Sequence, residues 1–383
     1  MLIIADSKIP HAEDAFKQFG EVRSVPTPQI TNDVLKNADV VLVRSETQVD
    51  AGLLEKTNVR FIGTATIGID HLDIEYLQKK NIGWASCPGS NANSVGEYVL
   101  AVMLELAERF DISLQNKTLG IVGHGNTGRM VEEKARALGM QVFLNDPPLA
   151  KATTADQYLP LDALMEADFI SLHVPLTKTG EHPTFHLLEK QRLQSMKGIL
   201  INASRGAVVD SDALKDVIRS GHLRACALDV WEDEPAIDAE LLELVTIGTP
   251  HIAGYSYDGK LKATQMLEQA LAKFFQLPCT PTVFEETQEL KEISLPDTPM
   301  SLEALVRETV RQCYSVGQDD ADLRRAGAYS TNERPAYFRR LRAEYRVRHE
   351  FSRYIVDVNE LDEETANTFA ALGFRINNLK DAA

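Results

Sequence analysis

Short apolar runs alternate with longer polar stretches over most of the chain. Each run has four to eight residues and many are β-branched, which is typical of strands buried on both faces of a sheet. The polar stretches have a helical spacing of apolar positions, so they predict helices joining parallel strands. The first set of predicted strands is 1–6, 38–44, 59–65 and 82–87. The second set is 119–122, 140–146, 169–174, 198–204, 225–230 and 245–252. The pattern predicts the α/β class with two doubly wound parallel-sheet domains.

A long apolar helix is predicted between the two sets, in "SNANSVGEYVLAVMLELAER". Ser94 is followed three residues later by Glu97, which matches a capping box and predicts that the helix starts there. Such a helix serves either as plain core or as a contact between domains or subunits, and the pattern leaves both possibilities open.

The alternation of apolar runs and helical stretches stops after residue 283. Residues 285–300 are polar and contain prolines, which predicts a linker. Beyond it, the sequence predicts a small α/β region from helical patterns and an apolar run. These segments are the helical 301–314 and 335–345, the apolar 353–358 and the helical 363–374.

Composition narrows the possible partners. The chain has 383 residues and a formal net charge of −16, which argues against binding to nucleic acid or to an anionic membrane surface. No stretch is long and apolar enough for a membrane span, and the N-terminus predicts a strand instead of a signal peptide. The four cysteines are widely spaced, so neither a disulfide framework nor a metal site is expected. We therefore expect a cytoplasmic protein.

The stretch "GIVGHGNTG" carries the pattern Gly123-x-Gly125-x-x-Gly128 between a predicted strand and a predicted helix. Gly123 permits a tight turn, Gly125 lets the backbone approach a pyrophosphate, and Gly128 permits close helix–strand packing. The helix N-terminus stabilises the negative charge of the ligand. Asp146 ends the next strand and suits the adenosine ribose hydroxyls, while its charge repels a 2′-phosphate. The sequence therefore predicts NAD, in preference to NADP, as cofactor.

Four further polar residues follow predicted strands, where ligands bind in open α/β sheets. His251 is suited to take a hydroxyl proton, and Glu234 to hold its imidazole in one tautomer. Arg205 is suited to clamp a substrate carboxylate, and Asp229 to hold the nicotinamide carboxamide. Taken singly, each of these residues could also have a purely structural role, such as a surface ion pair. Together, beyond a dinucleotide loop, they predict oxidation of a 2-hydroxy acid.

The motifs "GHGNTG", "NASRGAVVD", "LDVWEDEP" and "PHIAG", in this order, resemble the D-2-hydroxyacid dehydrogenase family. The resemblance covers about residues 40–275. It implies a flavodoxin-like substrate-binding domain at 1–92 plus 255–284, a Rossmann NAD domain at 93–254, and an active site in the cleft between them. Arg205, Glu234 and His251 are then the catalytic residues. The implied cofactor contacts are Gly123, Gly125, Asn126, Thr127, Gly128, Asp146, Val174, Ala203, Asp229 and Gly254.

Further segments resemble one branch of that family, which oxidises 4-phospho-D-erythronate on the route to pyridoxal 5′-phosphate (vitamin B6). These segments are "VRSET", "GTATIGIDHLD", "NDPP", "TIGTPHIAGYSYDGK" and the C-terminal extension. The resemblance implies substrate contacts by Ser45, Thr66 and Tyr255, and homodimerisation through residues 285–383. We expect Arg348 or Arg44 to bind the substrate phosphate.

Two alternatives remain at this point. The substrate is a different 2-hydroxy acid, such as 3-phosphoglycerate or glycerate, or the protein binds NAD as a sensor without turnover. The extra C-terminal segment argues against a simple glycerate enzyme, and the intact set of Arg205, Glu234 and His251 argues against a sensor. An activity measurement separates these possibilities.

Overall fold

The computed structural model describes residues 1–153, 157–284, 290–296, 298–359 and 361–377. These residues form two compact units. The first comprises Met1–Asn91 and Ser256–Glu289, and the second comprises Ala92–Tyr255 and Leu290–Ala383. Among the described residues, no helix has the length and apolar character needed to cross a membrane.

The first unit is built on a five-stranded parallel sheet with the order β2-β1-β3-β4-β5. This is the flavodoxin-like order, so the predicted doubly wound fold of this unit is confirmed. The strands are β1 Leu2–Asp6, β2 Glu21–Val25, β3 Val40–Val43, β4 Phe61–Thr64 and β5 Gly83–Ala85. The sequence pattern missed β2, because this edge strand is largely exposed and carries the polar sequence "EVRSV".

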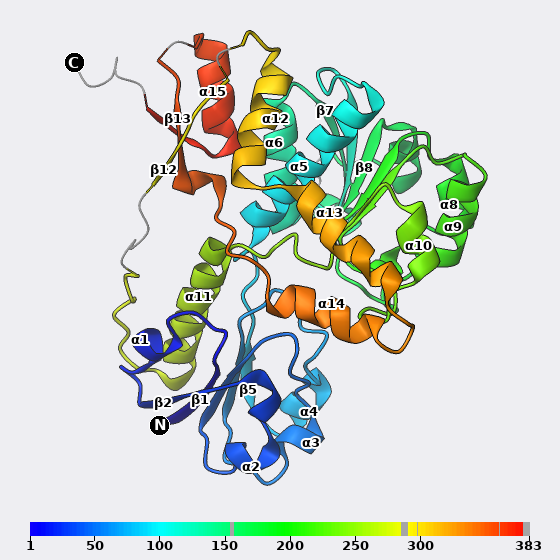
Figure 1. Ribbon diagram of the computed structural model, residues 1–383. Coiled ribbons are helices and arrows are strands. Elements are labelled where there is room, and N and C mark those ends of the chain that lie inside the picture. The colour runs from blue at the N-terminus through cyan, green and yellow to red at the C-terminus, as the bar shows by residue number, and fades with distance from the viewer. Residues whose placement is uncertain (154–156, 285–289, 297, 360, 378–383) are drawn as a thin grey trace. The chain divides into compact units, whose positions relative to one another are not determined.

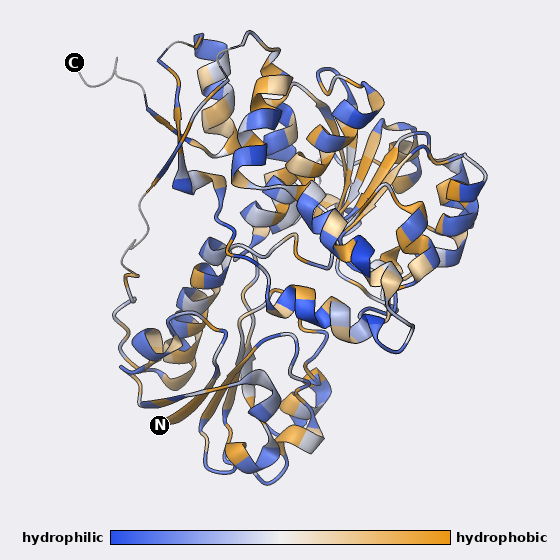
Figure 2. Cartoon of the chain, viewed as in Figure 1, coloured by the Kyte–Doolittle hydropathy of each residue, from blue (hydrophilic) through white to orange (hydrophobic). Residues whose placement is uncertain are grey.

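Helices cover both faces of the first sheet. Successive side chains along β1 and β3 point to opposite faces of the sheet and enter two separate cores. In β3, Val40 and Leu42 face one core, and Val41 and Val43 face the other. Helix α11 contributes Leu267 to the first of these cores. The hydrophobic residues follow the strands in Figure 2. The helices are α1 Ala12–Phe16, η1 Thr27–Gln29, α2 Asn32–Leu35, α3 Ala51–Leu54, α4 Ile74–Lys79 and α11 Tyr257–Phe275.

The second unit contains a six-stranded parallel sheet with the order β11-β10-β9-β8-β6-β7. The strands are β6 Thr118–Val122, β7 Gln141–Asn145, β8 Phe169–Leu172, β9 Ile199–Asn202, β10 Cys226–Leu228 and β11 Ile247–Gly248. A single parallel bridge from Leu144 to Tyr158 extends the edge beyond β7. With this reduced strand, the order is that of a Rossmann sheet with one additional strand.

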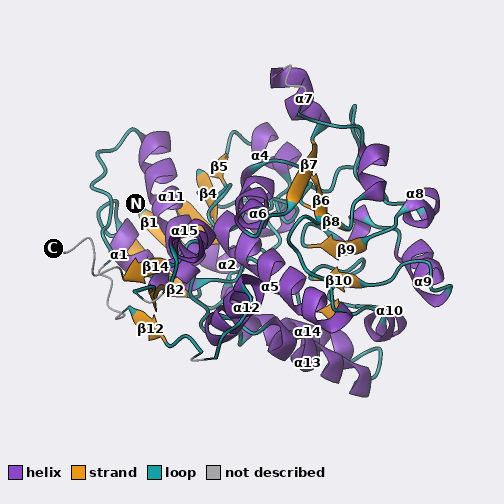
Figure 3. Ribbon diagram, turned by 90° about the horizontal axis from the view of Figure 1, so that it is seen from above, coloured by secondary structure: helices purple, strands orange, loops and turns teal. Residues whose placement is uncertain are grey.

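Helices again cover both faces of the sheet. Seen from above in Figure 3, α5 and α6 lie on one side of the row from β7 to β10, and α8 and α9 lie on the other. The sheet positions therefore alternate between two cores, with Ile199 and Ile201 in one and Leu200 in the other. The helices are α5 Ala92–Phe110, α6 Asn126–Ala137, α7 Pro147–Thr153, η2 Leu161–Glu166, α8 Lys190–Ser195, η3 Gly206–Val208, α9 Ser211–Arg219 and α10 Ala239–Leu244.

The predicted capping box at Ser94 is wrong. Helix α5 already begins at Ala92, and Ser94 is buried inside its first turn. The Ser94 hydroxyl donates to Oε1 of Glu350 at 2.8 Å, and Oε1 of Glu97 accepts from the backbone N–H of Phe351 at 2.8 Å. Both side chains therefore bind the C-terminal segment and do not cap the helix. Most residues of this helix are buried in the core of the second unit, and the helix also contacts the C-terminal segment; a contact with another subunit stays a prediction.

The C-terminal segment packs on the helices of the second unit. Helix α12 lies against α5, and α15 lies against α6 (Figure 1). The predicted linker contains a short strand, β12, which pairs with β13 in a three-stranded parallel sheet. The elements are β12 Lys291–Ile293, α12 Leu302–Cys313, α13 Val316–Arg324, η4 Arg325–Ala328, α14 Arg334–Ala343, η5 Phe351–Arg353, β13 Tyr354–Asp357, α15 Glu363–Leu372 and β14 Arg375–Asn377.

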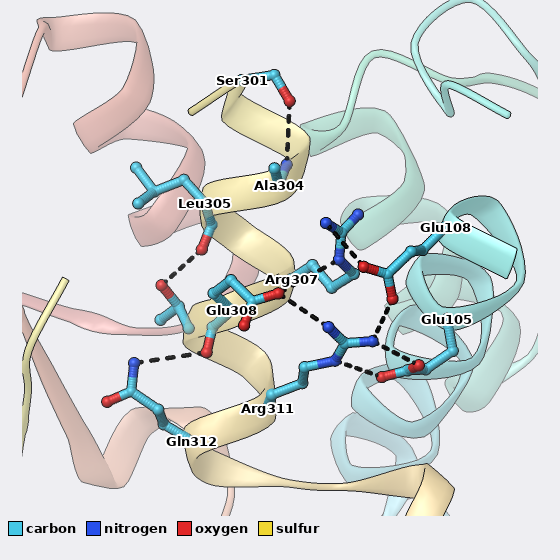
Figure 4. A network of polar contacts seen from close by, with 10 residues as sticks. Glu105, Glu108, Ser301, Ala304, Leu305, Arg307, Glu308, Arg311 and Gln312 are labelled. Carbon is cyan, nitrogen blue, oxygen red and sulfur yellow. Dashed lines mark hydrogen bonds and ion pairs between the residues drawn. The ribbon is translucent and has the colours of Figure 1, made fainter. Parts of the chain in front are cut away.

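A network of ion pairs joins α12 to α5 (Figure 4). The Arg311 guanidinium donates to both oxygens of Glu105, at 2.7 and 2.8 Å, and also pairs with Glu308 at 2.9 Å and with Glu108. The bidentate bond with Glu105 raises the pKa of Arg311 above its usual value. Bidentate pairs of this kind combine charge with fixed geometry, so the network fixes α12 on α5.

Candidate active site

The second unit places most of the predicted site residues along one edge of its sheet. All six strands run in parallel, so the loops that follow them emerge at the same carboxyl edge. From β7 to β10 there are four strand steps, or about 19 Å. The edge is therefore long enough to hold an extended ligand. The residues, by preceding strand, are Asp146 (β7); Gly123, Gly125, Asn126, Thr127 and Gly128 (β6); Val174 (β8); Ala203 and Arg205 (β9); Asp229 and Glu234 (β10); and His251 and Gly254 (β11).

The three glycines of the dinucleotide loop differ in what surrounds them. A Cβ atom on Gly123, which has φ +90°, would lie 2.6 Å from the carbonyl oxygen of His173. A Cβ on Gly128 would lie 2.1 Å from the carbonyl oxygen of Gly123. A Cβ on Gly125 would meet no described heavy atom within 4 Å. Gly123 and Gly128 are thus required by packing, whereas Gly125 leaves open space at the N-terminus of α6. That space fits the pyrophosphate of NAD.

Asp146 is fixed by two backbone N–H groups. Its Oδ2 accepts from His124 at 2.8 Å, and its Oδ1 accepts from Leu149 at 3.0 Å. Each carboxylate oxygen accepts more than one hydrogen bond, so both are still able to bind ribose hydroxyls. His124, which the sequence pattern did not single out, is itself held by Glu132 at 2.6 Å and by the Tyr158 hydroxyl at 3.1 Å. This arrangement fits the adenosine end of NAD.

The charge of Asp146 provides a direct test of cofactor preference. In the Asp146→Asn variant, we expect the ratio of kcat/KM with NAD to kcat/KM with NADP to fall about tenfold, equivalent to about 1.4 kcal/mol. The reason is that the amide removes the repulsion of a 2′-phosphate while keeping the size of the side chain. Steady-state kinetics with both cofactors measure the ratio, and an unchanged ratio would show that Asp146 does not face the ribose.

Glu234 and His251 form a hydrogen-bonded pair between Oε1 of the carboxylate and Nδ1 of the ring. The other oxygen of Glu234 accepts from the backbone N–H of Trp231 at 3.2 Å. Burial alone would raise the pKa of Glu234, but the charge and hydrogen bond of His251, the charge of Arg342 and the Trp231 N–H bring it below its usual value. Glu234 is therefore a carboxylate that binds Nδ1–H, and Nε2 of His251 is the nitrogen suited to proton exchange with a substrate.

The turn that carries His251 is held by Asp229. His251 has a left-handed φ of 56°, which is uncommon for a residue other than glycine and is concentrated at functional sites. Its N–H donates to the Asp229 carbonyl oxygen at 2.7 Å. The Asp229 carboxylate accepts from the N–H groups of Ile252 and Ala253 at 2.8 and 2.9 Å, and from the Thr249 hydroxyl at 2.7 Å. Asp229 thus fixes the position of the imidazole, and its contact with nicotinamide stays a prediction.

Arg205 lies on the loop between β9 and η3, next to the loop that carries Glu234. Its carbonyl oxygen accepts from Nδ2 of Asn202 at 3.0 Å, and its guanidinium donates to the carbonyl oxygen of Ser204 at 2.8 Å. A Cβ on Gly206 would lie 1.9 Å from the carbonyl carbon of Trp231, so the two loops touch through their backbones. Because the Trp231 N–H also donates to Glu234, this contact links the loop of Arg205 to the Glu234–His251 pair.

Three predicted substrate residues lie in the first unit, at the carboxyl ends of β3 and β4. Arg44 directly follows β3 and is 8% exposed, and its Nη1 is buried with no hydrogen-bond partner among the described residues. Ser45 is exposed. The Thr66 hydroxyl hydrogen-bonds with that of Thr64 at 2.7 Å and donates to the carbonyl oxygen of Gly68 at 2.9 Å. Arg44 is thus a buried cation with unused donor capacity.

The other two predicted substrate residues lie in the second unit. Tyr255 follows the His251 turn, and its hydroxyl accepts from Nη2 of Arg342 at 3.0 Å. Arg348 is 3% exposed, and its Nη2 donates to the carbonyl oxygens of Ser94 and Ala253, both at 2.7 Å. Arg348 therefore supports the turn that carries His251 from within the core. The sequence missed Arg342, because nothing distinguishes it from the six other arginines between residues 334 and 353.

Comparisons with known proteins show the family to which the chain belongs. Residues 102–253 match the NAD-binding domain of D-isomer specific 2-hydroxyacid dehydrogenases, and residues 285–373 match a domain of unknown function, DUF3410. The chain is 44% identical over 365 residues to an erythronate-4-phosphate dehydrogenase of Salinibacter ruber, covering 92% of this chain and 93% of that protein. It is 41% identical over 383 residues to the corresponding enzyme of Marinobacter nauticus, covering 98% and 100%.

Among solved structures, the chain is similar to a D-lactate dehydrogenase of Aquifex aeolicus in complex with NAD and lactic acid. The TM-score is 0.59 and the identity 27%, covering 72% of this chain and 96% of that one. Over a quarter of this chain thus has no counterpart in that enzyme. The fold, the dinucleotide loop and the relatives together show an NAD-dependent dehydrogenase of small 2-hydroxy acids. The chain belongs to the erythronate-4-phosphate dehydrogenase branch of the D-isomer specific 2-hydroxyacid dehydrogenase family.

Proposed function

We propose that the protein oxidises 4-phospho-D-erythronate to the corresponding 2-oxo-4-phosphate acid in pyridoxal 5′-phosphate synthesis. The observation that carries the proposal is the Glu234–His251 pair at the carboxyl edge of the NAD-binding sheet. The curated relatives similar over nearly the whole chain support the choice of substrate, since their names state this activity. When bound, NAD accepts the hydride from C2 of the substrate.

Residues of the chain carry out the proton transfer and orient the substrate. Nε2 of His251 takes the proton of the C2 hydroxyl as the carbon–oxygen double bond forms, and it returns that proton in the reverse reaction. Glu234 holds Nδ1–H, so the ring keeps the tautomer that the proton transfer requires. Arg205 binds the substrate carboxylate with its planar fork and thereby orients C2. Asp229 keeps the imidazole in place through the turn that follows β11.

For the substrate phosphate, Arg44 and Arg348 are both candidates. Nη1 of Arg44, and Nε and Nη1 of Arg348, are buried without a partner among the described residues, which is costly unless an anion binds there. Arg44 is tested first, because it is the more exposed of the two, at 8% against 3%, and because Nη2 of Arg348 already binds two carbonyl oxygens. Ser45 follows β3, as Arg44 does, and Thr66 follows the neighbouring strand β4; both are proposed to contact substrate, together with Tyr255.

We further propose that residues 285–383 mediate homodimerisation and that the protein is cytoplasmic. The match of this segment to a separate sequence family supports a dedicated role for it. Sedimentation of the full chain measures its mass in solution directly. A monomer at micromolar concentration would contradict the proposed dimer.

The substrate assignment is tested by comparing 4-phospho-D-erythronate, D-erythronate, 3-phosphoglycerate and glycerate under identical conditions. We expect the highest kcat/KM for 4-phospho-D-erythronate. The Arg44→Gln variant should lower it about 100-fold, or about 2.7 kcal/mol, while leaving kcat/KM for D-erythronate nearly unchanged. Higher activity with 3-phosphoglycerate or glycerate would keep the reaction class and overturn the substrate. NAD binding without turnover of any of the four would favour the sensing role.

A further inference from the structure

We infer that Arg342, on helix α14 of the C-terminal segment, is a positioning residue of the catalytic pair in its own chain. The inference rests on the proposed function and assigns a positioning role to the C-terminal segment, which matches a family described as a domain of unknown function. Arg342 would hold Tyr255 and maintain the negative charge of Glu234. The C-terminal segment would then be part of the active site as well as a folding or association element.

The first support is the contact of Arg342 with Tyr255. Its Nη2 donates to the Tyr255 hydroxyl at 3.0 Å, and its guanidinium carbon lies 5.5 Å from the centre of the Tyr255 ring. A cation over an aromatic face is attracted by the ring, and the hydrogen bond sets the direction of the hydroxyl. Tyr255 comes four residues after His251 and donates its N–H to the carbonyl oxygen of Ile252 at 2.8 Å. Arg342 therefore holds the residue that closes the His251 turn.

The second support is electrostatic. The positive charge of Arg342 lies close enough to Glu234 to contribute to the lowering of its pKa, after the larger opposing effect of burial and the lowering by His251. Glu234 keeps its imidazole partner in place only as a carboxylate. A charge that favours the carboxylate therefore extends the pH range in which the pair is intact.

The third support is the rigidity of the helix that carries Arg342. Phe338 is fully buried in the core that covers one face of the NAD-binding sheet, and the Tyr337 hydroxyl donates to the carbonyl oxygen of Asp322 at 2.7 Å. On the C-terminal side, the Tyr345 ring packs edge-on against Tyr255, with 5.9 Å between centres, and its hydroxyl donates to Asp319 at 2.8 Å. Arg342 is thus held from both sides within the second unit.

Several elements carry charged side chains near the pair in sequence or in contact with its loops. Arg342 is on α14, Glu232 and Asp233 are on the loop with Glu234, and Asp229 precedes them. Glu232 binds Nε2 of His186 at 2.8 Å, and Asp229 binds the turn after β11, so both carboxylates already have partners. Among these groups Arg342 contributes the positive charge that acts on Glu234 besides His251.

The test compares Arg342→Gln with Arg342→Lys, and uses Arg339→Gln on the same helix as control. Full-length protein is assayed for kcat/KM from acid to neutral pH, and thermal unfolding confirms the fold of each variant. The fall of kcat/KM at acid pH, which we call the acid limb, reports the titration of Glu234 and His251 as a coupled pair. Glu234 supports activity above its pKa and loses this role as the pH falls, so removing Arg342 should move the limb to higher pH.

For Arg342→Gln we expect an upward shift of about one pH unit and a roughly tenfold lower kcat at the optimum, in line with a single lost charge–charge interaction. Arg342→Lys should restore most of the limb position but not the full kcat, because the ammonium keeps the charge and loses the planar fork. Arg339→Gln should behave as wild type. A folded Arg342→Gln variant with wild-type kcat and acid limb would overturn the inference.

A second variant keeps the test decisive if Arg342→Gln does not fold. Tyr255→Phe removes the hydroxyl but leaves the charge, so it should lower kcat without moving the acid limb, and a shifted limb would contradict the assigned role. The profiles are recorded with whichever 2-hydroxy acid the wild type oxidises best. A different substrate would therefore overturn the proposed substrate while the Arg342 inference is still tested.

Discussion

The His251→Asn variant should lose kcat by about 1,000-fold, within the range known for removal of a general acid–base group. The hydroxyl proton then has no acceptor at the position that Nε2 of His251 occupies. The Glu234 carboxylate also loses the partner that it binds through Oε1. The effect is expected in kcat and in kcat/KM alike, because the lost interaction acts on the proton transfer itself.

Asparagine is the appropriate replacement, because the backbone at His251 has φ 56° and asparagine tolerates the left-handed region better than most residues. The Asp229 bonds to the turn use backbone N–H groups, so they survive the substitution. NADH binding and thermal unfolding of the variant should match those of the wild type. Wild-type turnover by a folded His251→Asn variant would show that another group moves the proton.

The Gly125→Val and Gly128→Val variants should fail for different reasons. A Cβ atom on Gly125 meets no described heavy atom within 4 Å, so we expect the fold to tolerate valine while the space for the pyrophosphate is filled. We expect the Kd for NADH to rise about 100-fold or more, equivalent to about 2.7 kcal/mol, with an unchanged melting temperature. Fluorescence titration and thermal unfolding measure the two quantities.

At Gly128, a Cβ would lie 2.1 Å from the Gly123 carbonyl oxygen, which belongs to the backbone and cannot yield locally. Gly128→Val should therefore lower the melting temperature of the second unit as well as abolish binding, since overpacking typically costs about 1–3 kcal/mol. If Gly125→Val bound NADH normally, the cofactor would not pass over this loop. If Gly128→Val kept its stability, the close packing of α6 on the sheet would not matter.

The predicted strands were largely found because buried parallel strands leave continuous apolar runs in the sequence. β2 was missed because one of its edges has no neighbouring strand and its residues are mostly exposed, so "EVRSV" has no such run. β12 lies in a polar stretch and pairs with residues more than 60 positions later, at Tyr354–Asp357. The local hydrophobic pattern holds no information about pairing between strands so far apart in the sequence.

The placement of the Glu234–His251 pair and of the Gly-rich loop at the carboxyl edge of the sheet was predictable, because both follow predicted strands, whereas their roles stay predictions. Ser94 illustrates the limit of such signals. Its spacing to Glu97 matches a capping box, but tertiary hydrogen bonds to Glu350 and Phe351 decide its role. Arg342 reaches Tyr255 only through the packing of a helix 87 positions away in sequence. One arginine among seven in that segment carries no mark of this contact in the sequence.

The most direct test of the account is a single-turnover reaction of purified protein with 4-phospho-D-erythronate and NAD, analysed by mass spectrometry. We expect an acid that has lost the two hydrogens of the C2 alcohol, formed together with NADH and absent with His251→Asn. If the protein binds NAD but forms no oxidised product from this acid, the proposed activity is wrong.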